Sequence, residues 1–443
     1  MIFPSPIHAF TWLSSTLDSS QVLTLLTKPF TWDGTFCPSD FEVDGKTGFF
    51  PSAPLPKLPD EYAIWEAAFA AAPSVLALGA DKNEEALSRR SDGAWWRTTV
   101  RSWPVKDVSI LRGDVRLLQR AHMVLASLMH FYVHSLPHTD TALVVPKSIA
   151  IPLVEVSREL GIAPVLTFAD TVLWNWELID PSLPVCVHNM RYLNIFSGTE
   201  TERAFYIASA AVELKGVEML EIFNRFQCLP RSGYADAHAI AQLGKDLSQL
   251  ASIIDELTEI FRSMRETVDP TEFYWVVRPW WAGATSKGPN HPGWILEGVP
   301  NGDSTHFDLG GASAGQSSVM HALDVFLDID HRLATSRMPA PTEPNRRADL
   351  GFMQRMWRYM PGKHREYLTR LQSVRPVAER TPNLREPYNA AADSTPPARF
   401  APDGGDGAEG TPKDGPARGT GGSAVSNLLK AGRDATRRAL LEN

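Results

Sequence analysis

The stretch Val115 to His134, VRLLQRAHMVLASLMHFYVH, contains no proline or glycine and is apolar on most of its faces. This pattern predicts a helix buried in the core of a sizeable domain, because it leaves no polar side to face solvent. His122 and His130 lie within it. Since buried polar side chains are normally hydrogen-bonded inside the core, we interpret both histidines as core residues rather than metal ligands.

More helices are expected after this stretch. Residues 148–180, SIAIPLVEVSRELGIAPVLTFADTVLWNWELID, predict two short helices split by a Gly/Pro-containing turn. Thr-Glu-Thr-Glu at 199–202 matches a capping box at the start of a helix. Apolar residues recur at helical spacing from Ala237 to about Val268. Two further helices are expected over 313–331 and 351–375. Because strand patterns are scarce, the predicted fold class is mainly α.

The length of 443 residues predicts two structural units. Residues 1–60 are rich in proline, glycine, serine and threonine and read as an irregular arm. Large apolar side chains almost disappear between 381 and 422. Such a segment cannot bury enough surface to offset its ordering entropy, so we expect a disordered linker there. Residues 423–443 predict a last helix that docks through its leucines.

Charge and cysteine content limit the kinds of partner. The 43 basic and 51 acidic residues give a net charge of −8, which disfavours nucleic acid and anionic membranes. Cys37, Cys186 and Cys228 lie too far apart in sequence for a metal-binding motif, and they suit a reducing compartment. No apolar run approaches the roughly 18 residues of a membrane span, and no secretory signal pattern is present. We therefore expect a cytoplasmic monomer.

Two short motifs suggest other enzyme classes. Gly311 to Gly315 matches the G-x-S-x-G turn of α/β-hydrolases, but the polar segment NGDSTHFDLG precedes it where a buried strand is required. His306 and Asp308 form half of a two-histidine, one-carboxylate iron site, whose usual scaffold is a double sheet. We favour neither motif. The small residues instead predict a helix start against which a flat ligand can lie.

Arg278 lies in the aromatic stretch FYWVVRPWW. An arginine there can hold a substrate carboxylate while the aromatic rings hold a planar body. A structural cation–π contact explains the same pattern equally well, and the sequence leaves both interpretations open.

Several long segments, in order, resemble the indoleamine 2,3-dioxygenase family. They are IPLVEVSRELGIAPVLTFADTVLWNW, AFYIASAAVE, FYWVVRPWWAG, GASAGQSSVMHALDVFLDI, MWRYMPGKHREYL and GTGG. The resemblance implies a small N-terminal α(+β) domain, residues 1–194, which contributes an arm and a lid over a larger all-helical domain, residues 195–443. It also implies heme b as the cofactor. The implied reaction uses O2 as co-substrate and cleaves the indole C2–C3 bond of L-tryptophan. The product, N-formylkynurenine, enters the kynurenine pathway.

The resemblance also implies which residues form the site. Ser209 would lie near the bound indole and Arg278 would hold the substrate carboxylate, and these two are the catalytic candidates. The remaining substrate-binding candidates are Phe168, Thr171, Val172, Phe205, Phe273, Trp281 and Thr420. Those expected at the heme are Ala312, Ser313, Ala314 and Asp324.

The chain departs from the family pattern at the iron ligand. The family continues a motif like LREPYNA as a helix with the proximal histidine, whereas Leu384 to Ala390 here runs into ADSTPPARFAPDGGDG, and no histidine follows His364. Axial ligation is the main control that a protein has over heme iron, so no metal ligand is assigned. Two hypotheses follow: a dioxygenase acting on tryptophan or an indole derivative, or a heme-free relative that binds an indole or a partner.

Overall fold

The computed structural model describes residues 36–137, 139, 141–228, 237–284, 293–300, 309–329, 355–372 and 384–394. Helices dominate these ranges, as the sequence predicts. The α-helices are α3 (Ala63–Val75), α4 (Glu84–Ser88), α5 (Arg90–Ser102), α6 (Val115–His134), α7 (Lys147–Leu160), α8 (Glu200–Cys228), α9 (Ala237–Thr267), α10 (Pro270–Glu272), α11 (Arg278–Trp281), α12 (Ser318–Phe326), α15 (Gly362–Gln372) and α16 (Arg385–Asp393). Two π-helical segments are η4 (Ala169–Leu173) and η7 (Phe273–Val277). The 3-10 turns are η1 (Pro38–Phe41), η2 (Asp60–Tyr62), η3 (Ser109–Leu111), η5 (Val187–Asn189), η9 (Ala314–Gln316) and η10 (Trp357–Tyr359).

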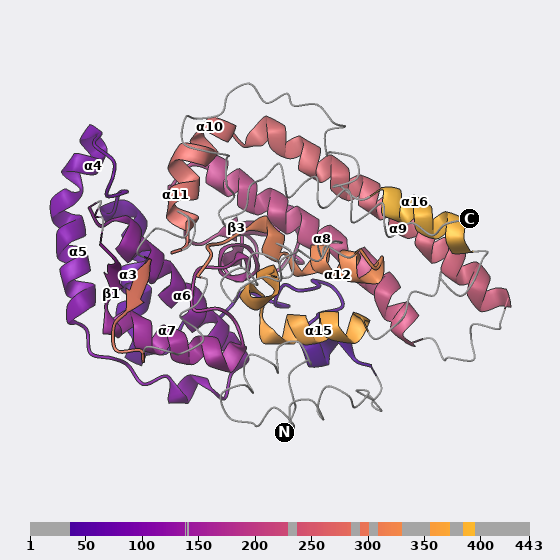
Figure 1. Cartoon of the computed structure of the whole chain (residues 1–443), viewed down its shortest axis with the longest axis horizontal. Helices are drawn as coiled ribbons and strands as arrows, with labels where there is room; N and C mark the ends of the chain where they lie inside the picture. Colours follow the sequence, from indigo (N-terminus) through magenta and orange to yellow (C-terminus); the bar gives the residue numbers. More distant parts are fainter. Residues whose placement is uncertain are drawn as a thin grey trace, which may run out of the picture.

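Helix α6 is the buried helix that the sequence predicts. Every residue from Leu118 to Val133 is buried, because α3 and α7 pack against α6 (Figure 1). Asp114 starts the helix by accepting hydrogen bonds from the backbone amides of Arg116 and Leu117, at 2.9 and 3.4 Å. The helix provides a rigid base for the segments that cross it.

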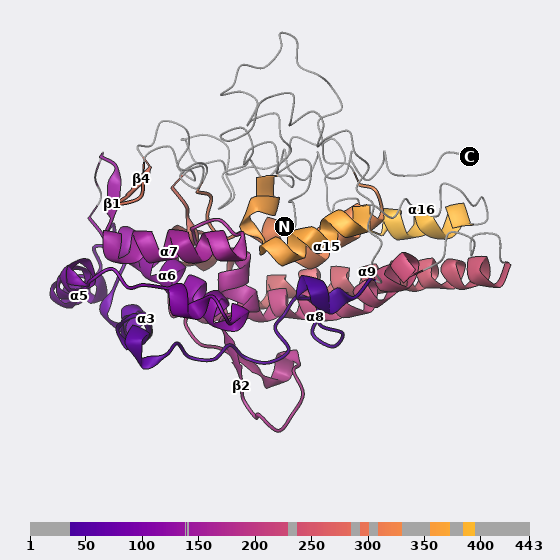
Figure 2. The ribbon, with the colours of Figure 1, turned by 90° about the horizontal axis from the view of Figure 1, so that it is seen from below.

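The second half of the fold is built on α8 and α9, which pack lengthwise against each other (Figures 1 and 2). The apolar stripe of α9 is buried as expected. Helix α12 packs on α8 and α15. A Cβ atom added at Gly216 of α8 would lie 2.4 Å from Cγ1 of Val319, so the close approach of α8 and α12 depends on this glycine.

Strands are few and short among the described residues. Parallel strands β1 (Leu143–Val145) and β4 (Trp294–Leu296) pair with each other, and β2 (Trp176–Leu178) pairs with β3 (Met190–Tyr192) in an antiparallel hairpin. The loop between β2 and β3 projects from the body in Figure 2. Within the described ranges, no helix combines the length and apolar character that crossing a membrane requires.

Residues 36–62 run from α15 to α3 with little regular structure (Figure 2). Phe41 and Phe49 of this segment pack their rings against Tyr367 of α15, with centroids 6.2 and 5.5 Å away. The N-terminal segment therefore contacts an element from the far end of the described chain.

One prediction about the tail is wrong at its start. Part of the expected linker over 381–422 is helical, because α16 has an apolar face that the composition of the whole segment conceals. Leu384, Tyr388, Ala391 and Ala392 are buried at helical spacing, and α16 packs on α9. The rest of the linker and the helix expected over 423–443 lie outside the described residues.

Smaller differences concern where helices begin. The helix expected from residue 313 starts at Ser318, because residues 314–316 form η9. The second helix expected within 148–180 is the π-helical η4. One of the two hydrogen bonds of the capping box is present: Thr199 Oγ1 accepts from the Glu202 amide at 3.2 Å. The Glu202 carboxylate accepts instead from the amides of Phe196 and Ser197, which precede Thr199.

Candidate functional site

The two π-helical segments carry or adjoin most of the residues expected at the substrate. Wide π turns are rare and recur at functional sites, because they present side chains that an α-helix would direct elsewhere. Segment η4 begins just after Phe168 and contains Thr171 and Val172. Segment η7 begins at Phe273 and leads directly into α11, which contains Arg278 and Trp281.

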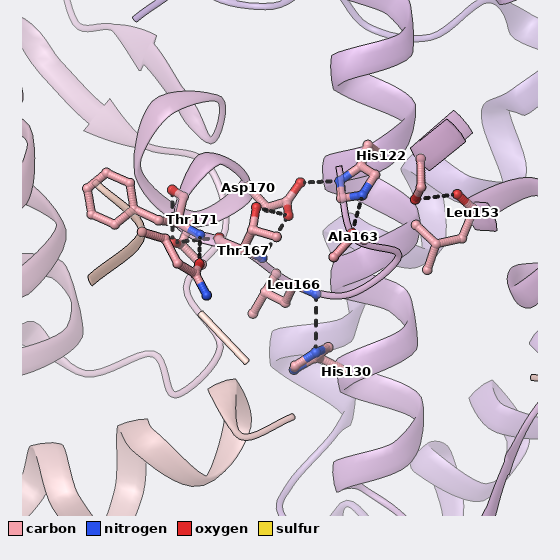
Figure 3. Close-up of polar contacts among 11 residues, drawn as sticks. His122, His130, Leu153, Ala163, Leu166, Thr167, Asp170 and Thr171 are labelled. Carbon is pink, nitrogen blue, oxygen red and sulfur yellow. Dashed lines mark hydrogen bonds and ion pairs between the residues drawn. The ribbon is translucent and has the colours of Figure 1, made fainter. Parts of the chain in front are cut away.

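Residues 168–172, the expected inner wall, are tied to α6 by a buried contact between Asp170 and His122 (Figure 3). Asp170 Oδ1 lies 2.7 Å from His122 Nδ1, and its Oδ2 accepts from the amide and hydroxyl of Thr167, each at 2.8 Å. His122 Nε2 lies 3.1 Å from the carbonyl oxygen of Ala163. Both ring nitrogens of His122 are therefore engaged with oxygen atoms of the segment 163–170.

The inner wall itself is buried and locally tied. Phe168, Thr171 and Val172 are each at most 5% exposed. The Thr171 hydroxyl donates to the carbonyl of Thr167 at 3.1 Å. A side chain that bonds its own preceding turn has a fixed rotamer, so this wall is preorganised.

Three rings expected around the substrate come together. The centroid of Phe205 lies 4.8 Å from that of Phe273 and 5.3 Å from that of Trp281, and Phe273 and Trp281 are 5.5 Å apart. The Trp281 indole donates to the buried Glu202 carboxylate at 3.3 Å. Burial raises the pKa of Glu202 from its usual value. Ser209, also buried, lies one turn after Phe205 on α8.

Arg278 is half-buried, and its guanidinium carbon lies 4.8 Å from the centroid of the Tyr274 ring. The cation–π contact left open by the sequence is therefore present. In the part of the chain that the structure describes, no carboxylate pairs with this arginine.

The small-residue platform, residues 310–314, lies against the same cluster. A Cβ atom at Gly311 would lie 1.6 Å from the carbonyl oxygen of Trp281, so the two backbones touch. Gln316 joins the platform to the inner wall: its Oε1 accepts from the Phe168 amide and its Nε2 donates to the Gly311 carbonyl, both at 2.8 Å. Ala312 is buried, Ser313 half-buried and Ala314 exposed.

Among the described residues, the hydrolase motif does not assemble an activated nucleophile. Ser313 Oγ accepts from the Gly315 amide at 3.3 Å as the cap of η9. The histidine nearest in sequence among the described residues, His321, lies 2.8 Å from the Gly315 carbonyl and 3.0 Å from the Trp357 indole nitrogen. Both ring nitrogens are engaged, so this imidazole cannot act as the base.

Four further expected positions are not among the groups described above. Asp324 lies near the C-terminal end of α12 and is half-buried. Thr420 lies outside the described residues, as do His306 and Asp308. Among the described residues, the three rings, Arg278 and the platform lie in contacting segments, and Gln316 joins the platform to the inner wall. The expectations for Thr420, His306 and Asp308 remain untested.

The heme implied by the resemblance needs a flat cradle on one face and an axial donor on the other. The platform and rings suit the first requirement. Among the described histidines, His122, His130 and His321 have both ring nitrogens hydrogen-bonded within the protein, and His364 Nδ1 lies 3.1 Å from Ser318 Oγ. The Tyr388 hydroxyl donates to the carbonyl of Leu327. These contacts occupy both ring nitrogens of His122, His130 and His321 but only one of His364, and within the described ranges no group of three metal-binding side chains occurs.

Sequence reasoning missed the residues that join these segments. All three joining residues, Asp170, Gln316 and Glu202, are buried. Asp170 is a carboxylate in the mainly apolar stretch LTFADTVL, and that contrast is a signal that could have identified it, whereas Gln316 and Glu202 lie in polar stretches that give no such signal. Glu213, one turn after Ser209 on α8, was also missed. It accepts a hydrogen bond from the Ser317 hydroxyl, and burial raises its pKa to about 7.

Several known proteins are similar to this chain over most of its length. A family profile described as indoleamine 2,3-dioxygenase matches residues 37–400. Indoleamine 2,3-dioxygenase 1 of Rattus norvegicus is 30% identical over 424 residues, covering 91% of this chain and 95% of that protein. An indoleamine 2,3-dioxygenase of Aspergillus candidus is 29% identical over 362 residues, 76% and 78% of the two chains. A 6-hydroxytryptophan 2,3-dioxygenase of Fusarium equiseti is 28% identical over 339 residues, 75% and 74% of the two chains.

Proposed function

This chain belongs to the indoleamine 2,3-dioxygenase family, and we propose that its site binds L-tryptophan or an indole derivative for oxidative opening of the indole C2–C3 bond. The observation that carries the proposal is the cluster of Phe205, Phe273 and Trp281 beside Arg278. Aromatic walls suit a planar indole, and a guanidinium without a carboxylate partner in the described residues suits an α-carboxylate. The family's heme, when bound, supplies the iron at which O2 is activated.

The substrate class extends to indole derivatives because a relative that matches three quarters of this chain is named as a 6-hydroxytryptophan dioxygenase. The inner wall of Phe168, Thr171 and Val172 is the part of the site that would contact the indole ring. A hydroxyl is present there in Thr171, although it already donates to its own backbone. We therefore propose L-tryptophan as the first substrate to test.

A second candidate function is indole binding without oxygen chemistry. The specific observation is that His122, His130 and His321 are all engaged in hydrogen bonds, while no histidine occurs in the sequence after His364. This chain would then keep the substrate-binding half of the site without turnover.

One set of measurements on the full chain separates the two candidates. The dioxygenase predicts a Soret band at one heme per chain after hemin addition, and formation of N-formylkynurenine from L-tryptophan, a reductant and O2. The heme-free candidate predicts calorimetric binding of L-tryptophan with neither signal. Absence of tryptophan binding in both the hemin-treated and untreated protein would contradict both.

A further inference from the structure

The imidazole of His130 lies between α11 and the segment that leads into the inner wall. Its Nδ1 is 2.8 Å from the carbonyl oxygen of Trp280, and the backbone amide of Leu166 donates to its Nε2 at 3.3 Å (Figure 3). Leu166 precedes the inner wall by two residues, and Trp280 lies between Arg278 and Trp281. A single side chain thus connects two segments that are distant in sequence.

The two hydrogen bonds indicate which nitrogen of the His130 ring carries the proton. A carbonyl oxygen only accepts and a backbone amide only donates, so both contacts form when the imidazole is neutral with its proton on Nδ1. The ring is fully buried, and burial lowers the pKa of His130 well below its usual value, as does the neighbouring His134. The rings of Trp294, His134 and Phe196 also pack on it, with centroids 5.2, 5.4 and 6.5 Å away.

Two other histidines of α6 hold the same segments. His122 contacts Ala163 and Asp170 on the inner-wall side. His134 Nε2 lies 2.8 Å from the carbonyl oxygen of Ala282, just after α11. His130 is the one of these three whose own ring reaches both segments, and it does so from a buried, rigid helix.

We propose that His130 is a positioning residue that sets the spacing between the inner wall and Arg278, and so determines the preference for indole ligands that carry a carboxylate. This role depends on the proposed function, which places the indole ligand between these segments. A rigid spacing matters because a displacement of about 1 Å between binding groups can cost about 100-fold in a precisely oriented site.

Three substitutions, each made in the full chain, test the bridge that His130 forms through its hydrogen bonds to Leu166 and Trp280. His130→Leu removes both hydrogen bonds at similar volume. His130→Asn keeps a donor near the δ position, and His130→Gln keeps an acceptor near the ε position, so each retains at most one half. Ser148→Ala is the matched control, because it removes a buried hydrogen bond of 2.7 Å to the carbonyl of Val100, between α7 and α5.

The ligand readout is the ratio of the Kd for tryptamine to the Kd for L-tryptophan, measured by calorimetry. Tryptamine lacks the carboxylate, so this ratio reports the Arg278 contact. We expect His130→Leu to lower the ratio at least about tenfold, with intermediate values for the Asn and Gln variants, while Ser148→Ala leaves it unchanged. A variant that weakens both ligands equally would show a merely structural role and overturn the proposal.

Hydrogen exchange provides a readout that needs no ligand. In His130→Leu, peptides covering 163–173 and 277–284 should both exchange faster than in the wild type, and in Ser148→Ala neither should change. Unchanged exchange in His130→Leu would overturn the bridge. If the wild type binds neither ligand, the proposed function fails and the ligand preference falls with it, whereas the exchange result still decides whether His130 joins the two segments.

Discussion

Arg278 is the residue whose role the sequence left open between substrate contact and cation–π packing. The structure shows its guanidinium over Tyr274, a contact that is compatible with binding a carboxylate from the other side. We expect Arg278→Ala to weaken L-tryptophan binding by roughly 1.5–3 kcal/mol, the range for a hydrogen bond to a charged group. Calorimetry should show little change for tryptamine. Equal affinity of the variant and the wild type for L-tryptophan would remove Arg278 from the site.

Glu213 should give a measurable pH signature. Burial raises its pKa from 4.5 to about 7, so the folded protein holds a proton that the unfolded chain releases between these values. The stabilising contribution of this proton is complete below pH 4.5 and is lost as pH rises through about 7. Relative to the wild type, Glu213→Gln should therefore gain stability with increasing pH, by roughly 3 kcal/mol between pH 4.5 and pH 8.

Urea unfolding of both proteins at several pH values measures this difference. The buried His364, whose pKa is lowered from 6.5 to about 3, contributes a trend of opposite sign, since its stabilisation is present above 6.5 and lost as pH falls through about 3. That trend is present in both proteins and cancels in the comparison. A pH-independent difference would show that Glu213 is ionised in the folded state.

For individual residues, the sequence predicted which residue types form the candidate site better than it predicted which of them contact one another. Arginine among aromatic residues and a run of small residues indicated a site for a planar, charged ligand, and the structure places these groups together. The role of His130 could not be predicted, because its partners lie 36 and 150 residues away. Hydrophobic periodicity shows that a side chain is buried but not which distant backbone group it meets.

Among the helices, long periodic patterns were the most reliable signal. Helices α6 and α9 lie where the sequence predicts them, because burial of a continuous apolar face decides their formation. The π turns η4 and η7 could not be predicted, since an extra residue per turn leaves no periodic signature in five residues. Helix α16 was missed because a glycine- and proline-rich continuation dominated the composition of its segment.

The contact of α8 with α12 can be tested by filling the space at Gly216. Alanine has the higher helix propensity, by about 1 kcal/mol, but its Cβ would lie 2.4 Å from Val319 Cγ1. Overpacking costs about 1–3 kcal/mol, and the contact with two methyl groups of Val319 places this site at the upper end. We therefore expect Gly216→Ala to lower the free energy of unfolding by about 1–2 kcal/mol, as measured by urea denaturation.

The matched variant is Val319→Ala, which removes the obstructing methyl groups. Alone it should be destabilising, because Val319 is fully buried. Combined with Gly216→Ala it should cost less than the sum of the two single changes, since each residue occupies the space that the other vacates. Strict additivity would mean that α8 and α12 move apart instead of sharing this contact.

Across the whole molecule, the segment 36–62 connects elements that are far apart in sequence, because it begins beside α15 and ends at α3. Tyr367 is the common contact: it is fully buried, its ring packs on Phe41 and Phe49, and its hydroxyl donates to Asn224 of α8 at 2.9 Å. The prediction of an N-terminal arm came from composition alone. Composition identified the irregular backbone but not its anchor, which is formed by side chains more than 300 residues apart.

Removing this anchor should affect stability throughout the fold. Tyr367→Ala is expected to lower the free energy of unfolding by about 3–5 kcal/mol, the usual cost of deleting a buried aromatic ring. Tyr367→Phe keeps the ring and loses one hydrogen bond, so it should cost only about 1 kcal/mol. Hydrogen exchange should then show faster exchange over 36–50 in the alanine variant and near wild-type exchange in the phenylalanine variant. If residues 36–50 stay protected in Tyr367→Ala, contacts other than this aromatic cluster hold the arm in place.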